Sequence, residues 1–327
     1  MEKVVIALDA MGGDYAPEQT VKGAVEAVNS SDEIRVILVG KQDMIAKELE
    51  KYKYAKEDIE VVHASEIIDM GDVPTIAIKD KKDSSLVVAM RLVREGKADA
   101  LVSAGSTGAV LVGGQLVVGR LKGIKRPPLA PFIPTTKGFS LLIDCGANVD
   151  ARPEHLVQFA QMGSIYYENV MGKKNPTVAL LNIGTEEEKG NQLVKDTKPL
   201  MKECKNINYI GSVEARELVS GAADVIVCEA FVGNVVLKFF EGLALTLFGS
   251  LKEGLMSSTR TKLGALLVKP ALKGLKNQFD TSSQGGAPLL GLKGLVVKAH
   301  GNSSSKEIEI ALKQCISFKK QKINEKI

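Results

Sequence analysis

Six stretches of the chain combine glycine with asparagine, aspartate, glutamate, serine or threonine directly after a short apolar run. Glycine lets backbone N–H groups approach an anion, and a helix that follows such a turn presents its positive end. One stretch of this kind is usually only a tight turn, but six with polar side chains beside the glycines predict a surface that binds phosphate. They are Asp9–Asp14, Ser103–Gly108, Asp144–Asp150, Asn182–Asn191, Glu229–Asn234 and Ala299–Ser303.

These stretches supply the residues expected to bind phosphate or the rest of a substrate. Asp9, Asp14 and Asp150 are expected to orient cations or to cap helices. Asn148 and Thr107 can bind phosphate oxygens, or each can form a local side-chain turn instead. The full set is Asp9, Gly12, Gly13, Asp14, Ser103, Gly105, Thr107, Gly108, Asn148, Asp150, Asn182, Gly184, Thr185 and Gly233.

Three further residues are the candidates for catalysis. Lys189 ends an acidic run, and its ammonium can reach a bound phosphate; the competing interpretation is a solvated lysine that counters Glu186–Glu188. His300 can donate to phosphate or to a leaving group, or it can be a structural histidine. Asn234 can hold a phosphate oxygen or an oxyanion, or it can form a local turn.

Signature motifs of several enzyme classes are absent from the sequence. It contains no G-x-G-x-x-G, no G-x-x-x-x-G-K-[ST], no G-x-S-x-G and no H-E-x-x-H. Their absence weighs against a nicotinamide-dependent enzyme, a Walker-type NTPase, a serine esterase and a zinc protease. Anion binding is therefore expected, while the motifs leave the reaction open.

The segments that carry these stretches alternate between strand and helix. Apolar runs without polar alternation are typical of strands covered by helices on both faces, and a 3.6-residue period indicates helices. The sequence therefore predicts an α/β protein with a largely parallel sheet, whose ligands bind at the carboxyl ends of the strands. Strands are predicted at Val4–Leu8, Ile34–Val39, Ile59–His63, Ala98–Ser103, Phe139–Ile143, Thr177–Leu181, Ile207–Ile210, Val225–Cys228 and Leu295–Lys298; helices at Pro17–Asn29, Ser84–Glu95, Glu154–Met171, Gln192–Cys204 and Ser303–Lys322.

Two regions interrupt this alternation. Arg126–Pro134 has four prolines in nine residues, which predicts an extended, stiff connection. Phe231–Ser283 contains no strand-like run and is predicted to be helical nearly throughout, with a break at Pro270. We expect one catalytic α/β domain over residues 1–327 that carries a helical excursion at about 231–283.

Composition narrows the classes of partner and location. The 45% hydrophobic and 25% charged residues are typical of a globular protein. With 43 basic and 39 acidic residues, 5% aromatic residues and no tryptophan, the chain is not expected to bind nucleic acid. The apolar run at Val4–Leu8 is too short for a signal peptide, and no apolar run approaches the roughly 20 residues of a membrane span. These features predict a cytoplasmic, non-spanning protein.

The cysteines and histidines predict neither a metal site nor a disulfide framework. The four cysteines lie far apart, without a C-x-x-C pair or a nearby histidine, so they are interpreted as reduced structural thiols. His63 and His155 are interpreted as structural. We expect no metal and no cofactor.

The motifs, in order along nearly the whole chain, resemble the bacterial phosphate acyltransferase family, PlsX, whose members make acyl-phosphate from acyl-acyl carrier protein. The sequence departs at Tyr15, Ser106 and Glu229-Ala230, where histidine, asparagine and Asp-Gly are common. The matching segments are ALDAMGGDYAP (7–17), SAGSTGA (103–109), GRLKGIKRPPLAP (119–131), DCGANVDARPEHLVQFAQMGS (144–164), LLNIGTEEEKGN (180–191), EAFVGNVVLK (229–238) and KAHGNSS (298–304).

The resemblance implies a three-layer α/β/α sandwich with a largely parallel, Rossmann-like sheet, a homodimer and a first step in phospholipid synthesis. It implies reversible transfer of a fatty acyl group from the carrier thioester to inorganic phosphate, followed by a membrane glycerol-3-phosphate acyltransferase. The residues fit direct attack by phosphate, because such a site needs charge-stabilising donors rather than an enzyme nucleophile. The alternatives are a short-chain phosphotransacylase that uses acyl-CoA and a non-catalytic membrane- or carrier-binding adaptor.

The outer part of the helical excursion combines leucines with cations. Between Gly254 and Gln278 there is no acidic residue, while five cations lie among the apolar residues. This pattern predicts contact with an anionic membrane surface or with the acidic carrier protein, and hence peripheral association with the inner face of the membrane. The alternative for its apolar face is a dimer interface. The expected contact residues are Leu263, Leu266, Leu267, Val268, Lys269 and Lys273.

Overall fold

The structure, a computed structural model, describes residues 3–279 and 285–327, without the side chains of residues 276 and 277. The chain forms two compact units. Unit 1 contains residues 1–131, 161–175 and 282–327, and unit 2 contains residues 132–160 and 176–281. The single catalytic domain expected from the sequence stays a prediction, because each unit is assembled from segments far apart in the chain.

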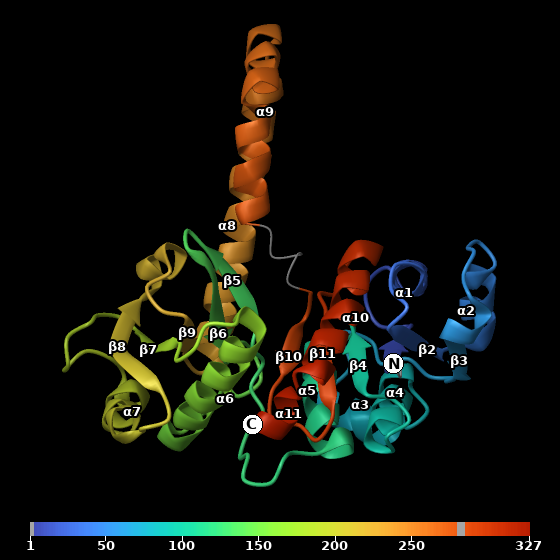
Figure 1. Cartoon of the computed structure of the whole chain (residues 1–327), viewed down its shortest axis with the longest axis horizontal. Coiled ribbons are helices and arrows are strands. Elements are labelled where there is room, and N and C mark those ends of the chain that lie inside the picture. The colour runs from blue at the N-terminus through green and yellow to red at the C-terminus, as the bar shows by residue number, and fades with distance from the viewer. Residues whose placement is uncertain (1–2, 280–284) are drawn as a thin grey trace. The chain divides into compact units, whose positions relative to one another are not determined.

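Unit 1 is built on a six-stranded sheet in the order β10-β11-β4-β1-β2-β3, parallel except for β10 (Figure 1). Its strands are β1 (Val4–Asp9), β2 (Ile34–Gly40), β3 (Ile59–His63), β4 (Ala100–Ser103), β10 (Ala287–Leu289) and β11 (Leu295–Lys298). Its helices are α1 (Glu18–Asn29), α2 (Gln42–Leu49), α3 (Pro74–Asp80), α4 (Ser85–Arg94), α5 (Thr107–Gly113), α10 (Ser305–Lys320) and α11 (Ile323–Lys326).

Helices cover both faces of this sheet, as the continuous apolar strands predict. Helices α1 and α10 pack against each other and against the sheet, and α4 packs against β1, β2 and β4. Right-handed crossovers place α4 on the face opposite α1, because the chain reverses direction across the sheet between β3 and β4. The carboxyl ends of β1, β4 and β11 are neighbours, so the loops that follow them lie at one edge.

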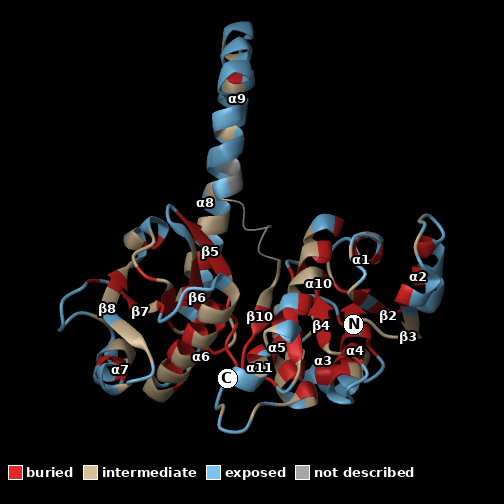
Figure 2. Ribbon diagram, viewed as in Figure 1, coloured by how far each residue is buried: buried red, intermediate tan, exposed pale blue. Residues whose placement is uncertain are grey.

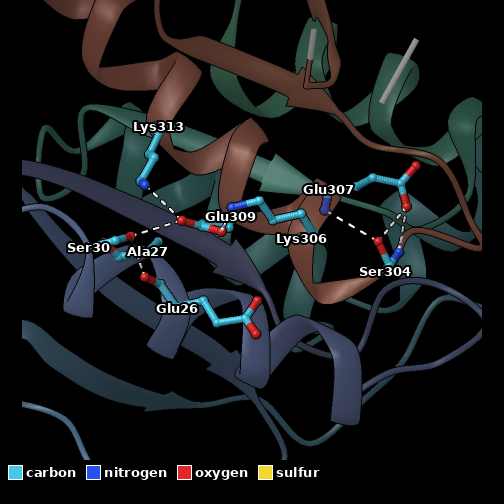
Figure 3. A network of polar contacts seen from close by, with 8 residues as sticks. All are labelled: Glu26, Ala27, Ser30, Ser304, Lys306, Glu307, Glu309 and Lys313. Atoms are coloured by element: carbon cyan, nitrogen blue, oxygen red, sulfur yellow. Dashed lines mark hydrogen bonds and ion pairs between the residues drawn. The ribbon is translucent and has the colours of Figure 1, made fainter. Parts of the chain in front are cut away.

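A polar network centred on Glu309 of α10 reaches Ser30 at the C-terminal end of α1 (Figure 3). Glu309 is buried and accepts hydrogen bonds from Lys306 Nζ (2.6 Å), Lys313 Nζ (2.7 Å) and the Ser30 hydroxyl (2.9 Å). Burial alone raises the pKa of Glu309, but these three hydrogen bonds outweigh it and lower the pKa to about 2. The N-terminus of α10 is closed by a reciprocal pair of hydrogen bonds between Ser304 and Glu307.

Unit 2 contains a five-stranded sheet in the order β5-β6-β9-β7-β8, parallel except for β5. Its strands are β5 (Phe132–Thr135), β6 (Gly138–Ile143), β7 (Thr177–Asn182), β8 (Asn208–Glu214) and β9 (Val225–Val227). Its helices are α7 (Gln192–Glu203), α8 (Ala230–Met256) and α9 (Thr259–Gln278), together with the first half of α6 (Pro153–Met171), which continues into unit 1.

The α/β class is confirmed, with two corrections to the strands. The expected strands fall into two sheets rather than one, and each sheet gains a short antiparallel edge strand, β5 or β10, that was not predicted. Strand β5 begins inside the proline-rich Arg126–Pro134, which is therefore not wholly a connection. Pro134 is accommodated because an edge strand tolerates a residue without an N–H donor.

The helical excursion is a hairpin of α8 and α9, joined at Ser257 and Ser258. The break expected at Pro270 does not occur, because Pro270 lies within α9. The hairpin is largely exposed (Figure 2). The last four residues of the excursion, 280–283, lie outside the described residues, as does the side chain of Lys276.

Helix α8 corrects the expectation that no apolar segment approaches the length of a membrane span. By length and composition α8 is apolar enough to cross a membrane, with a mean hydropathy of 1.6 over its most apolar window, of which 11% is buried. No unbroken apolar run of this length exists in the sequence, because α8 is interrupted by the Lys238–Glu241 ion pair (2.8 Å). An exposed apolar surface of this kind is a candidate contact surface.

Candidate functional site

In unit 1 the loops after β1 and β4 are joined by a buried carboxylate. Asp9 ends β1 and is 2% exposed, and its Oδ2 accepts a hydrogen bond from the Ser103 hydroxyl at the end of β4 (2.7 Å). The Ser103 oxygen in turn accepts the N–H of Gly105 (3.1 Å). Burial raises the pKa of Asp9, although hydrogen bonds from the Ser85 and Ser103 hydroxyls oppose the increase. Asp9 therefore organises two of the loops predicted to bind phosphate.

Two glycines allow these loops to approach each other. A Cβ on Gly12 would lie 2.4 Å from Asp9 Oδ2 and 2.8 Å from the nitrogen of Gly105. Gly13 has a φ of +106°, and a Cβ there would lie 2.9 Å from the carbonyl oxygen of Gly301. Asp14 follows, and its N–H donates to that same Gly301 oxygen (2.7 Å). The loops after β1, β4 and β11 are thus in contact.

Lys298, which was not predicted as a site residue, connects two of these loops. Its side chain is buried at the end of β11, and Nζ donates to the carbonyl oxygens of Ala104 (3.4 Å) and Ala299. The signal was present in the sequence as a lone lysine that ends an apolar strand. One of its carbonyl partners, Ala104, is distant in the chain and was not predictable.

The other predicted residues of unit 1 lie around this cluster. Thr107 and Gly108 form the first turn of α5, which is capped by Ser106, and a Cβ on Gly108 would lie 2.5 Å from Pro74. His300 is exposed, next to Gly301. Asp14 does not cap α1, whose first turn has Pro17 at the capping position and no side-chain hydrogen bond.

In unit 2 a second buried carboxylate, Asp144, organises the loop after β6. Its Oδ1 accepts the N–H of Ala147 (3.1 Å), and its Oδ2 accepts both the N–H and the side-chain amide of Asn148 (2.8 and 2.7 Å). Asp144 is fully buried, and the predicted residue Asn148 is 6% exposed. Asp144 was missed as a site residue, although it immediately follows an apolar strand.

Helix α8 begins directly against this loop. A Cβ on Gly233 would lie 1.9 Å from the carbonyl oxygen of Asp144, so only glycine allows the first turn of α8 to pack there. Asn234 faces the same loop, since its Oδ1 lies 4.0 Å from the position of a Cβ on Gly146. The carboxylate of Glu229 caps α8 by accepting the N–H groups of Phe231 (2.7 Å) and Val232 (2.8 Å). Those two donors are consequently occupied.

The loop after β7 folds around Asn182. Its side-chain amide donates to the carbonyl oxygens of Gly184 (2.9 Å) and Lys189 (3.1 Å). Gly190, at φ +114°, approaches Asn182 so closely that a Cβ there would lie 2.7 Å from its Oδ1. Lys189 and Thr185 are both exposed on the outside of this loop.

The ion pairs of the acidic run Glu186–Glu188 help to decide whether Lys189 counters this run or binds phosphate. Glu187 pairs with Lys202 of α7 (2.8 Å) rather than with Lys189. Among the described residues no carboxylate lies within 4.0 Å of the Lys189 ammonium. Its charge is consequently available to an anion.

The loops after β6, β7 and β9 surround an open pocket of about 540 Å³ in unit 2. Asp150 and Arg152 come from the first of these loops, Asn191 from the second and Glu229 from the third. The remaining lining residues are Val149, Ala151, Leu193 and Phe231. His155 supports the first loop, because its Nδ1 accepts the N–H of Arg152 (3.1 Å); this fits its structural interpretation.

The structure thus gathers the predicted residues of unit 1 into one cluster and those of unit 2 into two groups. Unit 1 joins Asp9, Gly12, Gly13, Asp14, Ser103 and Gly105, with Thr107, Gly108 and His300 at their border. Unit 2 joins Asn148, Gly233 and Asn234 in one group, and Asn182, Gly184 and Lys189 in another, with Asp150 lining the pocket between their loops.

The cysteines beside these loops are unsuited to act as nucleophiles. Cys145 and Cys228 are buried, and burial raises the pKa of both thiols well above the ordinary value. Burial likewise raises the pKa of the Cys315 thiol. In the described part of the chain no group of three or more histidine, cysteine, aspartate or glutamate side chains is placed to hold a metal ion.

Solved structures share this arrangement of elements. A phosphotransacetylase from Streptococcus pyogenes superposes with a TM-score of 0.64 at 18% identity, covering 96% of this chain and 93% of its own. The EutD phosphotransacetylase from Staphylococcus aureus superposes with a TM-score of 0.62 at 17% identity, covering 99% and 94%. The fold is therefore that of the phosphotransacetylase-like α/β proteins.

Relatives found by sequence similarity define the family of this chain more narrowly than the fold does. A phosphate acyltransferase from Alkaliphilus oremlandii is 55% identical over 322 residues, or 98% of this chain and 96% of its own length. One from Clostridium acetobutylicum is 50% identical over 324 residues, covering 99% and 98%. The family described as "Fatty acid synthesis protein" matches residues 4–326.

The chain belongs to this family, the PlsX family of phosphate acyltransferases, as the motifs indicated. It is an enzyme, an acyltransferase whose acyl acceptor is phosphate. The non-catalytic adaptor considered from the sequence is thereby set aside.

Proposed function

We propose that the enzyme transfers a fatty acyl group reversibly from the thioester of acyl-acyl carrier protein to inorganic phosphate, by direct attack of bound phosphate. The observation that supports this proposal is a combination of two features: polar loops surround an open pocket, and the thiols beside these loops are buried and hard to ionise. Such loops can stabilise charge, and no thiol beside them is prepared to form an acyl-enzyme.

The bond changes are simple. A phosphate oxygen forms a bond to the thioester carbonyl carbon, the carbonyl oxygen becomes an oxyanion, and the C–S bond then breaks to release the carrier thiolate. In this proposal Lys189 neutralises phosphate and Asn234 stabilises the oxyanion. Proton donation to the thiolate by His300 stays a prediction from the sequence. The backbone N–H groups of the glycine-rich loops hold the phosphate oxygens.

A decisive test of this assignment compares wild type with Lys189→Ala. Acyl-phosphate is trapped with hydroxylamine after incubation with palmitoyl-acyl carrier protein and phosphate. We expect turnover to fall by at least about 10²-fold in the variant, the scale of losing one charge-stabilising donor. Near-normal turnover would remove Lys189 from the site. A preference of the wild-type enzyme for acetyl-CoA would instead identify a short-chain phosphotransacylase.

We further propose that the α8–α9 hairpin brings the enzyme to its partners. The inner part of α8 exposes Val235, Phe239 and Leu243, which fit the interface of a homodimer. Near the turn of the hairpin, α9 exposes leucines 263, 266 and 267 by 67%, 66% and 85% among lysines, which fits an anionic membrane surface. The enzyme would then act in the cytoplasm at the inner face of the membrane and pass acyl-phosphate to a membrane glycerol-3-phosphate acyltransferase.

Flotation with anionic liposomes tests the hairpin. We expect Leu266→Glu/Leu267→Glu to lose vesicle binding while it keeps its oligomeric state and its activity on soluble substrate. Unchanged vesicle binding, or dissociation of a dimer into monomers, would show that these leucines do not contact the membrane.

A further inference from the structure

Lys198 of α7 is a buried ammonium whose partners are all backbone carbonyls. Its side chain is 3% exposed, and Nζ donates to the carbonyl oxygens of Glu186 (3.0 Å), Glu187 (2.8 Å) and Lys189 (3.0 Å). A lysine ammonium has three N–H donors, so these three hydrogen bonds use all of them. In the described part of the chain no carboxylate forms an ion pair with Lys198.

Because Lys198 is buried, its ammonium and the three carbonyl oxygens depend on each other for hydrogen bonds. An ammonium removed from water is costly unless it is hydrogen-bonded, and here only the loop after β7 supplies the acceptors. The three carbonyl oxygens must in turn point toward α7. Lys198, a side chain of the following helix, therefore helps to set the conformation of residues 186–189.

The same contacts fix the backbone from which the Lys189 side chain leaves. The Lys189 carbonyl oxygen accepts from both Lys198 Nζ (3.0 Å) and Asn182 Nδ2 (3.1 Å), and the Lys189 N–H donates to Glu186 (3.2 Å). The Lys189 stem crosses Gly184, where a Cβ would lie 3.1 Å from Lys189 Cγ. Little freedom remains at the base of this exposed side chain.

We propose that Lys198 is a positioning residue that acts through Lys189: it holds the loop so that the Lys189 ammonium is presented to the phosphate. This inference rests on the proposed function, in which Lys189 binds phosphate. Lys198 itself contacts no substrate, because all of its donors are used inside the protein.

A double-mutant cycle tests the inference. Lys198→Met is introduced into wild type and into Lys189→Ala, and kcat and the KM for phosphate are measured with palmitoyl-acyl carrier protein. We expect kcat/KM for phosphate to fall about 10- to 100-fold in the first background and by less than about twofold in the second, because the two residues act as one unit. An equal loss in both backgrounds overturns the inference alone. Full activity of Lys189→Ala overturns the proposed role of Lys189 and this inference with it.

A neighbouring lysine and a chemical rescue separate positioning from stability. Lys202→Met removes an exposed lysine one turn along the same helix, and we expect less than about a twofold change because only its surface pair with Glu187 is lost. In a Cys204→Ser background, Lys198→Cys is treated with bromoethylamine, which restores an ammonium of nearly the same length. Recovery of activity to within about threefold supports the inference; a folded, fully modified protein without recovery refutes it.

Discussion

Replacing Gly233 by alanine probes how closely α8 must approach the loop after β6. The added Cβ would lie 1.9 Å from the carbonyl oxygen of Asp144 and 3.0 Å from Cys228 Sγ, whereas Cβ atoms essentially never approach other atoms within 3.0 Å. Because a backbone carbonyl cannot rotate away like a side chain, the first turn of α8 must retreat by at least about 1.1 Å. Asn234 lies on that turn and retreats with it.

The expected effect on activity is much larger than the effect on stability. Overpacking costs about 1–3 kcal/mol, and the better helix propensity of alanine returns about 1 kcal/mol, so the net destabilisation is about 0–2 kcal/mol. A displacement of about 1 Å in a group that contacts substrate costs about 10²-fold in rate. We therefore expect Gly233→Ala to remain folded and to lose about 10²-fold in kcat.

The assay is hydroxylamine trapping of acyl-phosphate, run beside thermal unfolding. Gly242→Ala is the matched control in the same helix, because its added Cβ would meet no atom within 4 Å apart from its chain neighbours and the nearby backbone of its own helix. We expect the control to keep full activity and to gain about 0.5–1 kcal/mol in stability. Full activity in Gly233→Ala would refute the reasoning that this approach positions Asn234.

The remaining predictions concern buried ionisable groups. Glu309→Gln should destabilise the protein by about 2 kcal/mol at pH 7, because the folded pKa of this carboxyl, about 2, lies below its unfolded pKa near 4.5. The stability that the carboxylate contributes is present above pH 4.5 and is lost as the pH falls toward 2. Denaturation at pH 7 and pH 3 should therefore show a smaller difference between variant and wild type in acid, and a constant difference would contradict this. Asp9→Asn should leave the unfolding temperature unchanged or higher at pH 7, since burial raises the pKa of Asp9 and makes its charged form costly. The same variant should lower kcat about tenfold or more, because Asp9 organises two of the loops of the site. A lower unfolding temperature with full activity would contradict both the stability and the activity prediction. Cys145→Ala and Cys228→Ala should each keep activity within about threefold, as measured by hydroxylamine trapping, and a larger loss without unfolding would point to a thiol mechanism.

The sequence was sufficient to predict the longer helices and nine of the strands because their patterns are local, whereas the short helices α2, α3, α5 and α11 were not predicted. Nine strands and the main helices follow from continuous apolar runs and 3.6-residue periods. Strands β5 and β10 were not predicted because a run of three or four residues is too short to show a recognisable hydrophobic pattern. Strand β5 also contains Pro134, which is uncommon in strands. The division into two sheets was not predictable, since no local pattern states which parallel strands are neighbours.

The candidate site shows the same limit. The glycines and polar residues of the loops were identified because the residues that form a turn are neighbours in the sequence. Lys198 and Lys298 were missed because each looks like an ordinary lysine until the fold brings backbone carbonyls around it. Asp144 was missed because a buried carboxylate that accepts loop N–H groups has no sequence signature of its own.

Exchange between labelled free carrier protein and unlabelled palmitoyl-acyl carrier protein, with and without phosphate, tests the central claim most directly. If phosphate attacks the thioester itself, label enters the acyl carrier pool only when phosphate is present, and acyl-phosphate accumulates with the loss of thioester. Exchange that proceeds at the turnover rate without phosphate would require an acyl-enzyme and would contradict direct attack.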